Sequence, residues 1–343
     1  MKRKILLFAG LLFVFGSLYA QHFDKEKDFK IERSKDKTSV KIVEYKGKNS
    51  LVRIPPTIKK LPVTEITGFK GKNLAGVVIP EGVIIIGDSA FEDNQIKVAY
   101  IPDSVTTIGK SAFANNQLNA LVVPKGITSI GDGAFYRNKI EAVIVSGYVN
   151  SIGDSAFEEN QIVALVMGDN LNKIGDRAFM SNRLRVVAFP DSVTSVGAAA
   201  FQNNLIARLN FGSGLTSVGA AAFQNNRLTN IILSPKVTTI SSNVFQDNTI
   251  NNLTIPEGVT NIEPEAFRNN PLTSVTIPNS VKAFNINIFA EATNITQISI
   301  GGGVTISGTS SIFEKFMTFY NSPTINRRAG SYSLVNDNWE LSR

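Results

Sequence analysis

Phenylalanine recurs every 22 residues through most of this chain. Ten phenylalanines follow one another at that spacing without a slip, and Phe69 continues the series toward the amino terminus. A fixed short period of this kind is typical of a solenoid, in which equal coils of chain stack on one another. The ten residues are Phe91, Phe113, Phe135, Phe157, Phe179, Phe201, Phe223, Phe245, Phe267 and Phe289.

Apolar residues recur at the same distances after each Phe along the chain. They stand five, eight, ten, fourteen and seventeen residues after it, as Leu118, Leu121, Val123, Ile127 and Ile130 do after Phe113. The positions at eight and ten alternate with their neighbours, which is the period of a β-strand, and Pro often ends the run. We therefore expect a mainly β fold with one parallel strand per coil, paired with its equivalent one coil away at about 4.8 Å.

Two further columns carry Asn and Gly. Asn stands three residues after the Phe, from Asn94 to Asn270, between apolar positions. We expect these side chains to point inwards and to bond backbone groups of adjacent coils; a surface row of ligand-binding amides is the alternative. Gly fills one position six times in a row, from Gly109 to Gly219. It predicts a tight bend, where a Cβ would clash or φ is positive.

The segment from Asn94 to Asn116, "NQIKVAYIPDSVTTIGKSAFANN", contains every one of these columns. It resembles the BspA-like leucine-rich repeat of bacterial surface antigens, and the resemblance covers roughly residues 38–300. It implies a curved solenoid with one strand per coil and an irregular convex side. It also implies secretion or surface display and, for some relatives, adhesion to host or neighbouring-cell proteins.

The first residues are typical of a secretory signal. Lys2, Arg3 and Lys4 precede an apolar run, and Ala20 is a plausible cleavage residue, so residues 1–20 are interpreted as a signal peptide. An uncleaved membrane anchor is the alternative, although the run is short for a bilayer span. The chain contains no Cys, which excludes disulfides, thiolate metal sites and a lipidated amino-terminal Cys.

The formal charge of +7 is unevenly distributed. Residues 21–72 hold 14 basic and 7 acidic residues, whereas residues 73–343 hold 18 basic and 21 acidic ones. The basic part can touch an acidic surface such as lipid headgroups, glycans or nucleic acid. Alternatively, it is a solvated cap whose lysines keep this end from pairing with other chains. Interrupting acids favour the second interpretation, and export argues against a nucleic-acid partner.

We expect four segments along the chain. The signal peptide is followed by an amino-terminal β cap over residues 21–68, with strands near Phe29–Arg33, Val40–Tyr45 and Leu51–Ile54. The leucine-rich repeat array spans residues 69–309. Residues 310–343 form a carboxy-terminal cap, with a short helix, a terminal hairpin and Trp339, which we expect to close the solenoid end rather than to bind a partner.

The sequence offers little chemistry for catalysis. The only His is His22, close to the expected cleavage point, where it is poorly placed for a nucleophilic system. Asp88, Asp132, Asp154 and Asp176 recur after the bend, but no coil supplies the three or more oxygen ligands that Ca²⁺ prefers, and solvated turn residues are the simpler interpretation. We expect no catalytic residues, no metal site and no cofactor.

The outer face of the predicted sheet is the candidate binding site. Residues seven and nine positions after each Phe point away from the core, and they change from apolar to polar along the chain. An apolar stretch over several strands is typical of a partner-binding patch, with Tyr100 as its aromatic anchor. Strand propensity alone and self-association are the alternatives. The candidate residues are Val98, Tyr100, Val122, Ile144, Val166 and Val186.

These features favour an exported, non-enzymatic binding protein. The first hypothesis is an adhesin-like surface antigen, and its protein partner, from host matrix or bacterial envelope, is not identified by the sequence. The alternative is a periplasmic or secreted scaffold that joins proteins of the bacterial envelope and has no host ligand. Neither hypothesis includes a transmembrane segment once the signal is cleaved, because no later stretch is long and apolar enough.

Overall fold

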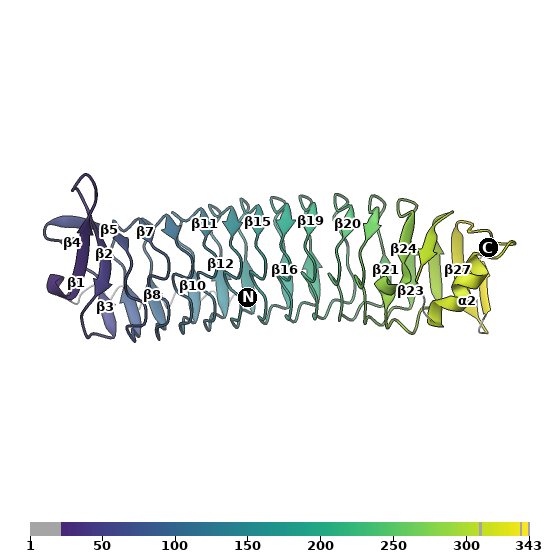
Figure 1. Cartoon of the computed structure of the whole chain (residues 1–343), viewed down its shortest axis with the longest axis horizontal. Helices are drawn as coiled ribbons and strands as arrows, with labels where there is room; N and C mark the ends of the chain where they lie inside the picture. Colours follow the sequence, from purple (N-terminus) through teal and green to yellow (C-terminus); the bar gives the residue numbers. More distant parts are fainter. Residues whose placement is uncertain (1–21, 309–310, 337, 342–343) are drawn as a thin grey trace.

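Equal coils of chain stack along one long axis to form a rod (Figure 1). The computed structural model describes residues 22–308, 311–336 and 338–341, so the expected signal peptide lies outside the described residues. Residues one coil apart face each other in register: Leu121 pairs with Val143, and Val143 pairs with Leu165. The expected mainly β leucine-rich-repeat solenoid with 22-residue coils is thereby confirmed.

Three-residue strands lie where the sequence predicts them: those from β6 to β23 begin seven residues after a Phe, and β25 begins eight residues after Phe289. They pair in parallel within separate groups (β3-β6-β8, β10-β12-β14, β16-β18 and β21-β23-β25), and residues 230–232 form no strand. The series, with its slightly longer last members, is β6 Gly76–Val78, β8 Val98–Tyr100, β10 Ala120–Val122, β12 Ala142–Ile144, β14 Ala164–Val166, β16 Val186–Ala188, β18 Arg208–Asn210, β21 Asn252–Thr254, β23 Ser274–Ile277 and β25 Gln297–Ile300.

Each coil also contains a second, shorter strand, so the expectation of one strand per coil needs correction. A two-residue strand ends at the apolar position seventeen residues after the Phe. Those from β7 to β19 form most of the longest sheet of the molecule, which the cap strands extend. Two residues are too few to show an alternating pattern, and only hydrogen bonds to neighbouring coils define them. They are β7 Ile85–Ile86, β9 Thr107–Ile108, β11 Ser129–Ile130, β13 Ser151–Ile152, β15 Lys173–Ile174, β17 Ser195–Val196, β19 Ser217–Val218, β20 Thr239–Ile240 and β22 Asn261–Ile262, followed by the longer β24 Ala283–Asn285 and β26 Thr305–Ser307.

The phenylalanine column forms the centre of the core. The rings of Phe113 and Phe135 lie nearly parallel, with an angle of 3° between their planes and 5.6 Å between their centroids. Phe157 continues the stack 5.4 Å from Phe135, and all three side chains are buried. Because each ring contacts its equivalents in the coils before and after it, the core is one continuous column along the rod.

The Asn column points into the core, as predicted. The side-chain oxygen of Asn116 accepts the backbone N–H of Ile96 at 2.9 Å. Its amide nitrogen donates to the carbonyls of Phe91 at 2.8 Å and Phe113 at 3.1 Å. The same pattern recurs through the array, so each buried amide joins two neighbouring coils and none of its polar atoms is left unpaired.

The Gly column marks a close approach between coils rather than a positive φ. A Cβ on Gly153 would lie 2.6 Å from the side-chain oxygen of Asp132 and 2.7 Å from its backbone nitrogen. Of the two reasons for Gly that the sequence left open, the steric one therefore applies here.

The amino-terminal cap continues the ladder of two-residue strands. Its β1 and β2 pair antiparallel, and β2, β5 and β7 then follow in parallel, so β1 is the last strand of the sheet. The bounds of β1, β2 and β3 agree with the three predicted strands to within one residue, whereas β4 and β5 were not predicted. The elements are η1 Glu26–Asp28, β1 Phe29–Arg33, β2 Val40–Tyr45, β3 Leu51–Arg53, β4 Thr57–Ile58 and β5 Leu61–Ile66.

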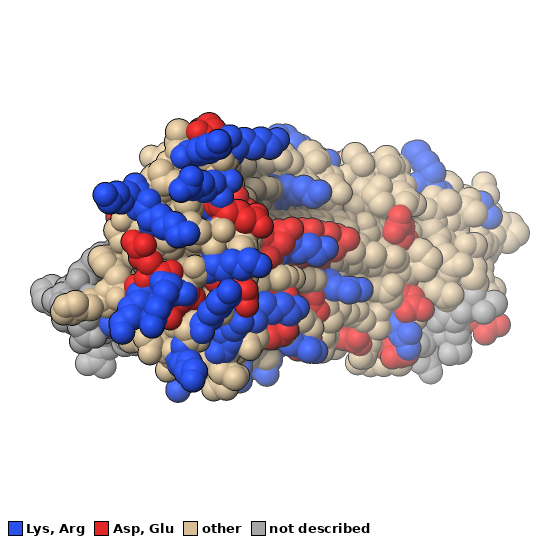
Figure 2. Space-filling view, turned by 60° about the vertical axis from the view of Figure 1, so that its left-hand side comes forward, with Lys and Arg blue, Asp and Glu red and all other residues tan. Residues whose placement is uncertain are grey.

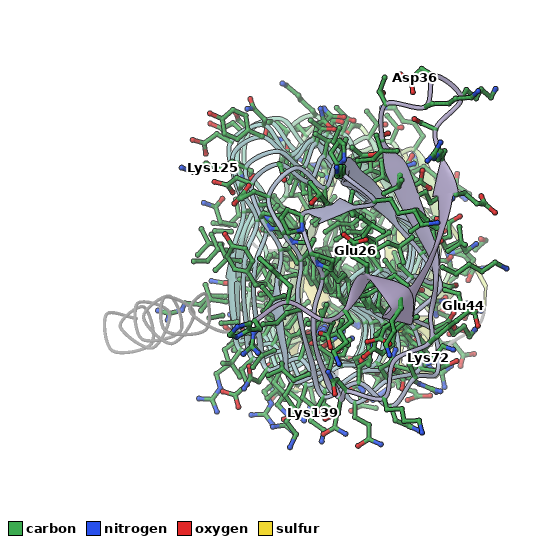
Figure 3. The ribbon with its side chains drawn as sticks, turned by 90° about the vertical axis from the view of Figure 1, so that its left-hand side faces the viewer. Glu26, Asp36, Glu44, Lys72, Lys125 and Lys139 are labelled. Atoms are coloured by element: carbon green, nitrogen blue, oxygen red, sulfur yellow. The ribbon has the colours of Figure 1, made fainter. Side chains whose placement is uncertain are left out.

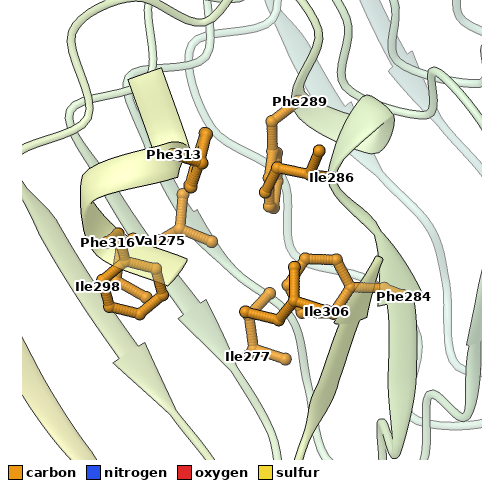
Figure 4. Close-up of a pocket in the computed structure, with 9 residues that line it drawn as sticks. All are labelled: Val275, Ile277, Phe284, Ile286, Phe289, Ile298, Ile306, Phe313 and Phe316. Atoms are coloured by element: carbon orange, nitrogen blue, oxygen red, sulfur yellow. The ribbon is translucent and has the colours of Figure 1, made fainter. Parts of the chain in front are cut away.

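A helix and a hairpin close the other end, as the sequence predicts. After η2 (Ile286–Phe289), α2 spans Ser311–Tyr320, and β27 (Gly330–Val335) pairs antiparallel with β28 (Asn338–Leu341). Trp339 is buried against Phe316, with 4.9 Å between ring centroids. Under α2, nine apolar side chains, among them Val275, line a cavity of about 10 Å³ (Figure 4).

Candidate protein-binding face

The three-residue strands direct one side chain inwards and two outwards. The middle residues Leu121, Val143 and Val187 are buried in the core. Their neighbours in the same strands lie on the outer surface of the rod, because side chains alternate along a strand. The outward positions are those that the sequence analysis selected.

Three of the six predicted residues lie together on one ladder. Val122 pairs with Ile144, and Ile144 pairs with Val166, so their side chains stand one coil apart on the same surface. Val122 is 51% exposed and Val166 is 54% exposed, whereas Ile144 between them is half-buried. We call these three residues, with Ala120, Ala142 and Ala164 of the same strands, the apolar face.

The other predicted residues belong to separate ladders. Val98 and Tyr100 lie on β8, which pairs with β6, and Val186 lies on β16, which pairs with β18. Tyr100 is half-buried, and its hydroxyl donates to the Glu81 carboxylate at 3.2 Å. This contact holds the ring of the expected aromatic anchor against the preceding coil, on a different ladder from the apolar face.

The exposed aromatic side chain of Tyr148 was missed by the sequence analysis. Tyr148 is 61% exposed in the turn that follows β12, four residues after Ile144. Gly126 and Asn170 occupy the same position in the coils before and after it. An aromatic residue at a position that otherwise holds small or polar turn residues is the sequence signal that could have identified Tyr148. Ile232 is 81% exposed in the coil that lacks a three-residue strand.

Beyond β16 the outer surface becomes polar. The outward positions of β18 are Arg208 and Asn210, both exposed. In the next paired strands, Ser274 donates its hydroxyl to the side chain of Asn252 at 2.7 Å. Ser274 and Asn252 thus bond to each other along the rod. Arg208 and Asn210 give the apolar face a polar boundary on its carboxy-terminal side.

One ion pair joins the coils that carry β12 and β14. The Arg137 guanidinium donates to the Glu159 carboxylate at 2.8 Å, and this bond lowers the pKa of Glu159. Burial, reinforced by the Glu159 charge, raises the pKa of the neighbouring Tyr136. Both charged side chains are exposed, so the pair aligns neighbouring coils and adds little stability.

The recurrent aspartates also act between coils. The carboxylate of Asp132 accepts the backbone N–H of Asp154 at 3.0 Å, and Asp154 accepts that of Asp176 at 2.9 Å. Each carboxylate thus accepts a hydrogen bond from the backbone of the turn in the next coil. Within the described residues, no three His, Cys, Asp or Glu side chains are grouped closely enough to hold a metal ion.

His22 is exposed at the first described position. In the same part of the chain, no helix combines the length and the apolar character that crossing a bilayer requires.

Comparison with known proteins places the chain in a family. It matches the BspA type leucine-rich repeat region in six copies, over residues 64–185, 150–272 and 216–336. No curated protein matches it.

Solved structures with a similar fold come from several bacteria. A leucine-rich cell surface protein of Faecalibacterium prausnitzii is 20% identical, with 86% of this chain and 97% of that one covered and a TM-score of 0.44. A leucine-rich repeat protein of Bacteroides ovatus is 19% identical, with 84% and 90% covered and a TM-score of 0.49. The pneumococcal vaccine antigen PcpA is 16% identical, with 83% and 87% covered and a TM-score of 0.44. On its sequence match across most of its length, this chain belongs to the BspA-type leucine-rich repeat family.

Proposed function

We propose that this protein is an exported, non-enzymatic protein-binding solenoid, an adhesin-like surface antigen that contacts its partner through the apolar face. The observation that carries the proposal is the in-register row of Val122, Ile144 and Val166 on an exposed surface. Exposed apolar side chains on adjacent strands form the kind of patch that protein partners cover. Leucine-rich repeats present such extended surfaces on a rigid frame.

Rigidity of the coils supports binding over catalysis. The Phe and Asn columns fix each strand relative to the next, so a partner meets a surface that is already ordered and little entropy is lost on binding. The carboxylates that recur in the turns are engaged by backbone N–H groups of neighbouring coils. Tyr148, exposed near the end of β12, is the aromatic residue best placed to extend the contact.

The test is a triple substitution of Val122, Ile144 and Val166 to Ser. Proteins of host extracellular matrix and of the producing cell's envelope are captured with the native chain and with this variant. We expect the variant to lose the captured partner while its melting temperature stays nearly unchanged, because the side chains are largely outside the core. Equal capture by both proteins would remove the apolar face from the proposal.

A matched control lies in the polar half of the same column. Substitution of Asn210, Thr254 and Thr276 to Ser alters the same position of three other coils, and we expect capture to be retained. Sedimentation of the free protein tests the competing explanation. If the native chain sediments with the mass of a dimer and the triple Ser variant with the mass of a monomer, the face joins two copies of this protein instead.

The second candidate function is a scaffold that joins envelope proteins within the producing cell. In this case the protein also binds through the apolar face, but it lies within the cell envelope and not on the cell surface. Protease treatment of intact cells separates the two: degradation supports surface display and adhesion, whereas protection together with release in the periplasmic fraction supports the scaffold.

A further inference from the structure

Basic side chains gather at the amino-terminal end of the rod. Figure 2 shows this end crowded with Lys and Arg, whereas the array behind it is mostly uncharged surface with scattered charges of both signs. The cap elements bring these residues together, because β1 is the last strand of the sheet and the β4–β5 hairpin stands beside it (Figure 1). The basic residues therefore surround one blunt end of the molecule and do not run along its side.

Most of these cations have no carboxylate partner within the described residues. Lys41 pairs with Glu65 at 2.6 Å, and Lys70 pairs with Glu92 at 2.7 Å. Eleven others are exposed, with no ion pair within 4.0 Å: Lys25, Lys27, Lys30, Arg33, Lys35, Lys37, Lys46, Lys48, Lys59, Lys60 and Lys72.

The acids that interrupt these lysines in the sequence bond to other groups. Asp24 accepts the backbone N–H of Arg53 at 2.7 Å. Glu26, near the middle of the end in Figure 3, accepts the backbone N–H of Lys59 at 3.1 Å. Asp36, on the loop that projects beyond the rim, accepts the Thr38 hydroxyl at 2.8 Å. These carboxylates hold the turns in shape, and the ammonium groups remain directed to solvent.

Three of the lysines occupy backbone conformations that favour Gly or Asn. Lys59 and Lys60 are the two central residues of the β4–β5 hairpin, with φ of 51° and 66°, and Lys37 in the β1–β2 turn has φ of 62°. A two-residue hairpin loop with positive φ at both positions is ordinarily Asn-Gly. Lys at these positions is unfavourable for the backbone, but it places two adjacent charges at the tip.

We propose that this amino-terminal end docks on an anionic phospholipid surface, with the rod standing away from it. Cations from separate turns surround a blunt end, so a plane of phosphate headgroups meets many of them at once. Most are Lys, whose compact charge suits a fluid surface of headgroups, whereas Arg is preferred for fixed bidentate contacts. Phe23 is 52% exposed in the same cap and supplies an apolar side chain that can enter the headgroup layer.

The first experiment measures binding of the exported protein to phosphatidylglycerol vesicles by flotation. We expect binding that weakens steeply as salt rises, and no binding to phosphatidylcholine vesicles. Substituting Lys35, Lys37, Lys59 and Lys60 with Gln should reduce binding by about 100-fold or more. The control replaces Lys97, Lys110, Lys125 and Lys173, exposed lysines of the array, with Gln and should bind as the native chain does.

A second comparison separates lipid from soluble polyanions. Phe23→Ser should weaken binding to phosphatidylglycerol vesicles but leave the retention of the protein by immobilised polyphosphate unchanged. Equal vesicle binding by the native chain and the cap Gln variant would overturn the proposal. So would polyphosphate retention without any vesicle binding, or a vesicle affinity that Phe23→Ser does not alter.

A third variant excludes loss of folding as the explanation. Replacing Lys59 with Asn and Lys60 with Gly suits the hairpin conformation better and removes two charges from the tip. We expect the melting temperature to rise while vesicle binding falls, a combination that misfolding does not produce. Retained vesicle binding in this variant and in the cap Gln variant contradicts the inference. Partner capture through the apolar face is a separate measurement, so the two proposals can fail independently.

Discussion

The side-chain oxygen of Asn160 accepts the backbone N–H of Ile140, 20 residues earlier in the chain, at 3.1 Å. The amide nitrogen of the same side chain donates to the carbonyl of Phe135 at 2.9 Å and to that of Phe157 at 3.2 Å. One buried polar side chain thus fixes the height of one coil above another. The repetition of this contact keeps the coils at equal spacing, and the apolar face depends on that spacing.

Asn160→Ala should destabilise the array strongly. The substitution leaves the buried N–H of Ile140 unpaired, which costs about 1–3 kcal/mol. It also removes one of two side-chain hydrogen bonds to each of the Phe135 and Phe157 carbonyls, each worth about 0.5–1.5 kcal/mol. We expect the free energy of unfolding to fall by about 3 kcal/mol or more, measured by urea denaturation. Asn150→Ala, at an exposed position of the preceding coil, should change it by less than about 0.5 kcal/mol. Similar effects of the two substitutions would contradict the role given to the Asn column.

Phe157→Ala should divide the cooperative unit. The ring stacks on Phe135 and Phe179 at 5.4 and 5.3 Å, and its removal from a buried site costs about 3–5 kcal/mol. Because each coil is stabilised by its neighbours, calorimetry should resolve two transitions in place of one. Phe157→Leu refills most of the volume and should keep a single, slightly lower transition. A single unshifted transition for Phe157→Ala would show that the stack adds little.

Asp36 should stay ionised in acid while the cap is folded. The hydroxyls of Ser34 and Thr38, at 2.6 and 2.8 Å, and the Thr38 N–H, at 3.1 Å, lower its pKa from 3.8 to about 2. The folded-state pKa is depressed, so its stabilising contribution is complete above the ordinary pKa and is lost as pH falls through about 2. A carbon-detected NMR titration should give this value, and Ser34→Ala should raise it. A pKa near 3.8 in the native protein would mean that these bonds do not hold the carboxylate in solution.

Val275→Ile should stabilise the carboxy-terminal end. Val275 lines the small apolar cavity under α2, and an added methylene there buries apolar surface worth about 0.8 kcal/mol. Val143 occupies the equivalent position in the middle of the array, and Val143→Ile should instead cost about 1–3 kcal/mol by overpacking. Thermal unfolding of the two variants checks the difference, and a loss of stability from Val275→Ile would contradict it.

The position of each residue within the repeat predicted which side chains of the candidate site face outwards. It did not predict the contacts that those side chains make. The alternation around Leu121 and Val143 correctly placed Val122 and Ile144 on the outside of the rod. Tyr100 was assigned as an anchor because it is aromatic and points outwards. Its hydrogen bond to Glu81, 19 residues earlier, depends on how one coil lies against another, which no single coil encodes.

The 22-residue spacing by itself determined the solenoid, the stacked Phe core and the inward Asn column. Side chains that recur at equal intervals satisfy their packing and hydrogen bonds only when equal coils are stacked. The tertiary structure alone decided three things: the second ladder of two-residue strands, the breaks between groups of three-residue strands, and the bonding of the cap carboxylates to backbone and hydroxyl donors instead of lysines. Each depends on hydrogen bonds between segments distant in the sequence, where local pattern and propensity carry no signal.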